Sequence, residues 1–129
     1  MDALQRILAD DARIEYALVF GSSARRTAHA GSDLDVAVGL KSSTRLGALE
    51  LGALVSRLEN AAGCPVDLVV LDEAPPGLAY RVFRDGRVIV EKNHRLLIER
   101  KTRAILEYLD FRPMESLAAS GVLTAAKRG

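Results

Sequence analysis

Residues 18–38 read LVFGSSARRTAHAGSDLDVAV, and the order of residue types in this stretch decides the fold. The apolar run that ends at Phe20 is followed at once by Gly21, which predicts a buried strand ending in a sharp turn. From Asp33 onward, Asp33 and Asp35 alternate with apolar residues, which predicts a second strand. Successive side chains of a strand point to opposite faces, so the two carboxylates share one face, about 6–7 Å apart along the chain.

The turn between these two strands has the features of a phosphate-binding site. Gly21 allows the backbone to turn tightly and to come close to a bound group. Ser22 offers a hydroxyl group, and backbone N–H groups at the start of a helix suit a phosphate. The alternative is an ordinary strand exit followed by a helix N-cap. Neither a P-loop nor a GxGxxG fingerprint is present in the sequence, which disfavours kinase-like and Rossmann sites.

Three aspartates form the candidate metal site. Asp33 and Asp35 can converge on a pair of divalent ions, and Asp67 adds a third carboxylate where it interrupts an apolar run. A buried unpaired charge is costly, so a shared cation would stabilise Asp67 there. Carboxylate oxygens suit Mg²⁺ or Mn²⁺ and not zinc. Alternatively, Asp33 and Asp35 face solvent on an edge strand, and Asp67 lies at the exposed start of its strand or pairs with an arginine.

Hydrophobic periodicity outlines the rest of the fold. We expect helices at residues 1–13, 43–62, 78–84 and 95–111, and strands at residues 16–20, 33–38, 66–71 and 87–91. The strand at 66–71 should be covered on both faces because it is apolar on both. This order of elements predicts one α/β (α+β) domain over residues 1–129, with a mixed central sheet flanked by helices.

The ends of the two longest helices can also be predicted. Ser43 or Thr44 would cap the helix at 43–62. The last helix should stop before Pro113, with a helical or frayed tail after residue 114. Its basic residues Arg100, Lys101 and Arg103 are expected on an exposed face that could contact an acidic partner.

Length and composition exclude several classes of protein. The chain has 129 residues, too few for a separate substrate or nucleic-acid module beside this domain. No stretch approaches the roughly 20 apolar residues that span a bilayer, and the N-terminus lacks the pattern of a signal peptide. We therefore expect a cytoplasmic protein with no membrane contact. The formal net charge of +1 argues against nucleic acid as the primary partner.

The segment GSSARRTAHAGSDLDVAV resembles the signature of the DNA polymerase β-type nucleotidyltransferase superfamily, in which ten residues separate a GS turn from a DxD pair. The chain is most similar to the minimal nucleotidyltransferase branch. Its residues 100–114, RKTRAILEYLDFRPM, also resemble the C-terminal helix of that branch. The resemblance implies that Gly21 and Ser22 bind the triphosphate. It assigns Asp33 and Asp35 to two Mg²⁺ ions, Asp67 to the third catalytic carboxylate, and Arg25 to a phosphate contact. Arg26 departs from the pattern because glycine often follows that arginine.

Many members of this branch are antitoxins paired with a HEPN-type toxin, and some transfer AMP from ATP to a tyrosine of the toxin. The resemblance therefore implies a metal-dependent nucleotidyltransferase that acts on a hydroxyl of a HEPN-type toxin and forms a hetero-oligomer with it. Two alternatives stay open. The chain could neutralise the toxin by direct binding without catalysis, or it could modify a small molecule.

Overall fold

The computed structural model describes residues 2–21 and 33–120, and the side chains of residues 2–21 and 33–110. The elements in chain order are α1 (Asp2–Asp10), β1 (Ile14–Phe20), β2 (Leu34–Leu40), α2 (Ala48–Ala62), β3 (Val66–Val70), the 3₁₀ turn η1 (Leu71–Glu73), α3 (Pro76–Asp85), β4 (Arg87–Glu91) and α4 (His94–Ser120). Within the described ranges, no helix combines the length and apolar character required to cross a membrane.

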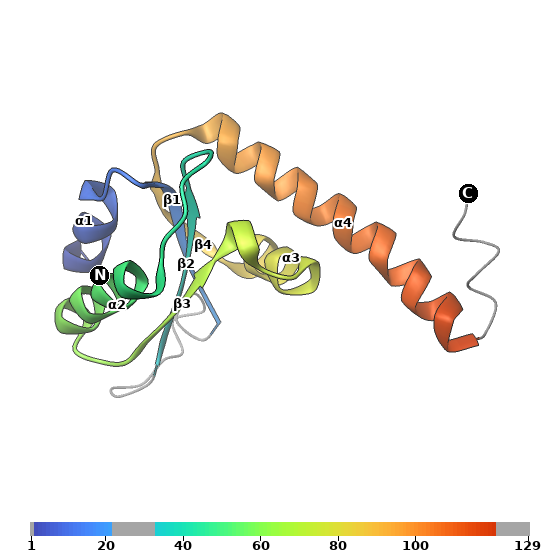
Figure 1. Cartoon of the computed structure of the whole chain (residues 1–129), viewed down its shortest axis with the longest axis horizontal. Coiled ribbons are helices and arrows are strands. Elements are labelled where there is room, and N and C mark those ends of the chain that lie inside the picture. Colours follow the sequence, from blue (N-terminus) through green and yellow to red (C-terminus); the bar gives the residue numbers. More distant parts are fainter. Residues whose placement is uncertain (1, 22–32, 121–129) are drawn as a thin grey trace.

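The four strands form one mixed sheet in the order β3-β2-β1-β4. Strand β1 pairs antiparallel with both β2 and β4, whereas β2 and β3 are parallel. The parallel pair requires a crossover connection, and α2 provides it. Figure 1 shows α1 and α2 on one face of the sheet and α3 and α4 on the other, so the predicted fold class is confirmed.

The alternation of side chains along each strand divides the core into two clusters. Val19 of β1 and Val36 of β2 point to the face covered by α1 and α2, where Leu54 and Leu58 of α2 pack. The next residues along the same strands point the other way. There they meet α3 and α4 in a second cluster composed of Tyr16, Leu18, Ala37, Leu71, Ala79, Val82, Phe83, Leu97 and Ala104.

Two expectations about the boundaries of the helices were wrong, one at the start of α2 and one at the end of α4. Helix α2 begins at Ala48 and not near residue 43: Ser43 adopts a positive φ of 66° in a turn, and Gly47 is the N-cap. The Glu50 carboxylate accepts a hydrogen bond from the Gly47 backbone N–H at 2.8 Å, which fixes this start. Gly63 ends the helix in a left-handed conformation, as glycine does at many helix ends.

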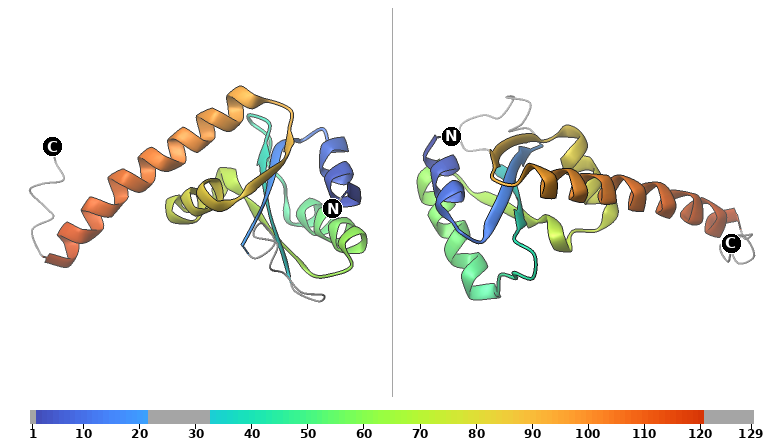
Figure 2. Two further views of the ribbon diagram at one scale, coloured as in Figure 1. Left: turned by 180° about the vertical axis from the view of Figure 1, so that it is seen from behind. Right: turned by 90° about the horizontal axis from the view of Figure 1, so that it is seen from above.

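Helix α4 continues through Pro113 to Ser120. A proline within a helix removes one hydrogen bond, and its ring crowds the carbonyl of the residue four positions earlier. The helix nevertheless continues across Pro113. Good helix formers follow it in the sequence. The views in Figures 1 and 2 show α4 extending well beyond the sheet and α3.

Strand β3 is an edge strand whose apolar residues pack on both faces of the sheet, with Leu68 and Val70 against the first core cluster and Val69 against the second. These residues are nevertheless less buried than those of the neighbouring strand β2. Only Val66 of this strand is fully buried, and Asp67 is exposed. The argument that a buried Asp67 needs a cation is therefore wrong in its premise. Its alternative, an aspartate at the exposed start of the strand, describes the position of Asp67 correctly.

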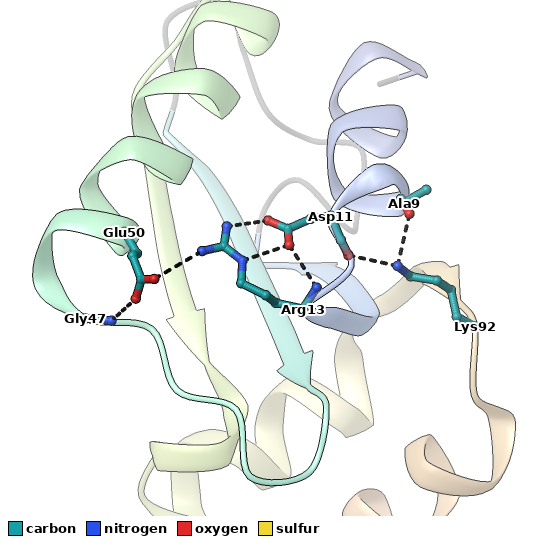
Figure 3. A network of polar contacts seen from close by, with 6 residues as sticks. All are labelled: Ala9, Asp11, Arg13, Gly47, Glu50 and Lys92. Carbon is teal, nitrogen blue, oxygen red and sulfur yellow. Dashed lines mark hydrogen bonds and ion pairs between the residues drawn. The ribbon is translucent and has the colours of Figure 1, made fainter.

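A polar network fixes one end of the sheet, where β1 begins and β4 ends (Figure 3). Asp11 accepts hydrogen bonds from the backbone and the side chain of Arg13, and these bonds hold the pKa of Asp11 below its usual value. The Lys92 ammonium donates to the Ala9 and Asp11 carbonyl oxygens at 3.0 and 2.9 Å. Helix α1 is thereby tied to the end of β4.

A second polar contact anchors α4 to the sheet. The Arg100 guanidinium donates to the Asp72 carboxylate, whose other oxygen accepts the Leu40 backbone N–H at 3.1 Å. The side chains of Arg100 and Asp72 are only 15% and 21% exposed. The expectation that Arg100 belongs to an exposed basic face was therefore wrong, because a carboxylate from η1 draws it inward.

We expect Asp72→Ala to lower the free energy of unfolding by about 2–3 kcal/mol, because it leaves the Arg100 charge and the Leu40 N–H without their partner. Urea unfolding followed by circular dichroism measures this loss. Glu73→Ala is the matched control: its pair with Arg45 is 3.9 Å long and exposed, so the change should stay within about 0.5 kcal/mol. Equal losses in both variants would show that the Asp72 contact does not anchor α4.

Candidate active site

Three strand ends bring the candidate residues together. Strand β1 ends at Phe20, directly before Gly21, and β2 begins just after Asp33. The register pairs Phe20 with Asp35 and Asp35 with Asp67, so these three residues lie side by side across β1, β2 and β3. Neighbouring strands are about 4.8 Å apart, which places the backbones of Asp35 and Asp67 within one strand spacing.

The face on which these side chains lie follows from the alternation along β2. Ala37, two residues after Asp35, belongs to the core cluster beneath α3 and α4, and so does Val69, two residues after Asp67. Asp35 and Asp67 therefore point to the same side of the sheet as α3. The core ends abruptly here: Val36 and Ala37 are fully buried, Asp35 is half-buried, and Asp33 and Asp67 are exposed. The carboxylates form the solvent-facing rim of that core.

Position 21 requires a glycine, because the Asp35 side chain occupies the space that a side chain there would need. The φ of Gly21, 68°, lies in the left-handed region, where side chains are strained, and a Cβ atom built on it would overlap Oδ2 of Asp35. One of the candidate carboxylates therefore lies directly against this glycine, and the predicted approach of a bound phosphate to Gly21 stays a prediction. Ser22 and Arg25 lie outside the described residues.

Charge accumulates at this rim. Burial and the neighbouring charges of Asp67 and Asp33 raise the pKa of Asp35 above its usual value. Within residues 2–21 and 33–110, the ion pairs involve none of these three carboxylates. The site therefore carries mutual repulsion that a bound cation would relieve.

The carboxylates fit a divalent cation by their chemistry. The described ranges contain no three Asp, Glu, His or Cys side chains already gathered into a ready-made metal site. The three aspartates nevertheless offer only oxygen ligands from neighbouring backbone positions, and Mg²⁺ prefers such ligands while keeping some of its water. Burial and the neighbouring charges of Asp67 and Asp33 raise the pKa of Asp35, and a cation at this rim would offset the repulsion among the three carboxylates.

A cavity of about 320 Å³ lies away from these carboxylates. It is lined by residues of η1, α3 and α4, including Asp72, Phe83 and Arg103. The turn η1 follows the far end of β3, so this cavity is at the opposite end of the sheet from Asp67. Its position links it to the α4 anchor and not to the carboxylate rim.

Comparison with known proteins identifies the fold. The family described as "Polymerase beta, Nucleotidyltransferase" matches residues 2–95. No curated protein matches the sequence at a significant level.

Solved structures agree over a longer part of the chain. A chain of a toxin–antitoxin structure with AMP-PNP is 22% identical, with a TM-score of 0.81 over 95% of this chain and 98% of that one. A chain of the Shewanella oneidensis complex between a tri-AMPylated HEPN toxin and an MNT antitoxin is 20% identical, with a TM-score of 0.75 over 95% of both chains. A structure provisionally described as a minimal nucleotidyltransferase is 30% identical over 67% of this chain and 85% of that one, with a TM-score of 0.55.

The family match extends from α1 to the start of α4 and so includes every strand and all three aspartates of the rim. The protein belongs to the polymerase β-type nucleotidyltransferases, and its fold is that of the MNT antitoxins of HEPN–MNT toxin–antitoxin systems.

Proposed function

We propose that this protein transfers AMP from ATP to a tyrosine hydroxyl group of a HEPN-type toxin and thereby acts as the antitoxin. The observation that carries the proposal is the carboxylate rim itself: Asp35 and Asp67 are register partners, and Asp35 touches the backbone at Gly21. A phosphate-binding turn against paired carboxylates is the arrangement that nucleotidyl transfer needs.

The reaction is an in-line displacement at the α-phosphorus of ATP. The acceptor oxygen forms a bond to that phosphorus while the bond to the bridging oxygen breaks, and pyrophosphate leaves. The hydroxyl proton must be removed, and Asp67 is suited to accept it because it is exposed beside Asp35. Gly21 and Ser22 bind the triphosphate, and Arg25 adds a phosphate contact in this proposal.

Asp33, Asp35 and Asp67 would hold the Mg²⁺ ions, which Mn²⁺ could replace. Bound there, the cations would lower the pKa of the acceptor hydroxyl and neutralise charge on the phosphates. The half-buried position of Asp35 strengthens its interaction with a cation, because charges interact more strongly where water is partly excluded.

The similar structures support the choice of acceptor and donor. One contains AMP-PNP, and another contains a HEPN toxin that carries three AMP groups. The exposure of the carboxylate rim also favours a macromolecular acceptor. The rim is open, since Asp33 and Asp67 are exposed, and a protein acceptor brings its own binding surface to such a site.

The test is to incubate the protein with the protein encoded beside it, Mg²⁺ and ATP labelled at the α-phosphate. We expect label on a tyrosine of the partner, measured by intact mass and peptide mapping. Asp33→Asn and Asp67→Asn should remove the label, whereas Asp10→Asn, an exposed aspartate of α1, should keep it. Full inhibition of the partner without nucleotide, and with no adduct, would instead establish an antitoxin that acts by direct binding.

A further inference from the structure

A second cavity, of about 240 Å³, adjoins the carboxylate rim. Its lining combines Phe20 and Gly21 at the end of β1 with one face of α3, formed by Leu78, Arg81, Val82 and Asp85. These four helical positions are spaced by three, one and three residues, so they lie on the same side of α3. The cavity is therefore built between a helix and a strand end that the core already holds in place.

Gly21 connects this cavity to the carboxylates. It lines the cavity, and the space that its missing side chain leaves is filled by the Asp35 carboxylate. Phe20, the register partner of Asp35, points to the same face of the sheet. A ligand whose phosphates lie at Gly21 would thus reach the cavity directly with its remaining part.

The size and chemistry of the cavity select which part of the ligand enters it. Pockets that enclose a whole ligand usually measure roughly 300–1,000 Å³, so this cavity suits only a fragment of a nucleoside triphosphate. Phe20, Leu78 and Val82 provide an apolar surface, and Arg81 provides a planar cation that can stack on a base. The Asp85 carboxylate, which accepts two hydrogen bonds from Arg84 at 2.9 Å, disfavours phosphate at its edge of the cavity.

We propose that the cavity between β1 and α3 binds the base and ribose of the nucleoside triphosphate, with Leu78 and Arg81 as determinants of nucleoside affinity. The proposal rests on the proposed nucleotidyltransferase function and adds to it the binding site for the part of the donor that does not react. The triphosphate then extends across Gly21 toward Asp35.

The experiment compares two ligands by isothermal titration calorimetry in the presence of Mg²⁺. One is α,β-methylene-ATP, which cannot transfer its AMP group, and the other is inorganic tripolyphosphate, which lacks the nucleoside. Leu78→Trp, which fills the cavity, should weaken binding of the nucleotide analogue about tenfold or more and leave tripolyphosphate binding unchanged. Arg81→Ala, at an exposed position that does not threaten folding, should weaken nucleotide binding about fivefold.

Leu49→Trp is the matched control, because Leu49 is 90% exposed on α2, across the sheet from the cavity. Asp35→Asn should weaken binding of both ligands, which separates the phosphate end of the site from the nucleoside end. If the wild-type chain binds neither ligand, the proposed function fails as well. If it binds both, and Leu78→Trp and Arg81→Ala retain wild-type affinity for the analogue, only the assignment of the cavity is overturned.

Discussion

Asp35→Asn is expected to abolish nucleotidyl transfer while making the metal-free protein more stable. The substitution removes one negative charge from the ligands proposed for both cations, and the loss of such an interaction reduces turnover by at least about 100–1,000-fold. In the metal-free protein the same charge is unfavourable, because burial and the charges of Asp67 and Asp33 oppose its ionisation. One substitution should therefore move activity and stability in opposite directions.

The pH dependence of stability follows from the direction of the pKa shift. Because the folded-state pKa of Asp35 is raised above its unfolded value, the native state binds more protons between those two values. The contribution of this group to stability is consequently greatest at low pH, is lost as pH rises through the folded pKa, and remains unfavourable at pH 7. Asp35→Asn should remove this dependence.

Differential scanning calorimetry in EDTA, at pH 7 and at a series of lower pH values, measures both effects. We expect a higher Tm for Asp35→Asn than for the wild type at pH 7, and a difference that shrinks as the pH falls. Adding Mg²⁺ should raise the Tm of the wild type more than that of the variant. Asp10→Asn serves as the control for the loss of an exposed carboxylate. A lower Tm for the metal-free Asp35→Asn variant would mean that Asp35 supports the fold and is not held there against repulsion.

The sequence predicted the elements around the carboxylates well, for a physical reason. Strands β1 and β2 are short and strongly patterned, and the glycine between them marks a sharp turn. Alternation alone places Asp33 and Asp35 on one face, and it also indicates which residues turn inward. Such local patterns can be interpreted without knowing how the helices pack against the sheet.

Long-range contacts were not predictable in the same way. The apolar run at 66–71 carries no signal that distinguishes an edge strand from a central one, so the sequence could not decide between a buried Asp67 and an exposed one. Arg100 resembles its basic neighbours in sequence, but the Asp72 carboxylate, 28 residues away, draws it into a half-buried contact. The cavity beside Gly21 depends on how α3 packs against β1, and the spacing of Leu78 and Arg81 shows only that they share a helical face.

Gly39 is a further position whose importance is visible only in the structure. It is the next-to-last residue of β2, and a glycine within a strand ordinarily weakens the strand. The register pairs it with Tyr16, whose ring is fully buried and covers it, so that a Cβ atom on residue 39 would overlap the ring. The aromatic side chain occupies the space that any other residue at position 39 would need.

Gly39→Ala should therefore destabilise the protein strongly. Forcing an additional carbon into a well-packed core costs about 1–3 kcal/mol, and the overlap with a rigid ring places this variant at the upper end. For a chain of this length we expect the Tm to fall by about 10 °C.

Gly52→Ala is the opposite case, since Gly52 lies in α2 and a Cβ atom there meets no atom within 4 Å. It should stabilise the protein by about 0.5–1 kcal/mol through better helix propensity.

A rescue experiment distinguishes the overlap with Tyr16 from a general intolerance of β2 to substitution. Tyr16→Leu removes the ring that collides with residue 39, so the Gly39→Ala/Tyr16→Leu double variant should lose less stability than the sum of the two single changes, by about 1–2 kcal/mol. Tyr16→Phe keeps the ring and should give no such rescue. Urea unfolding of the three single variants, the two double variants and the wild type measures the coupling. Additive losses in both double-variant combinations would show that the Tyr16 ring is not what excludes a side chain at position 39.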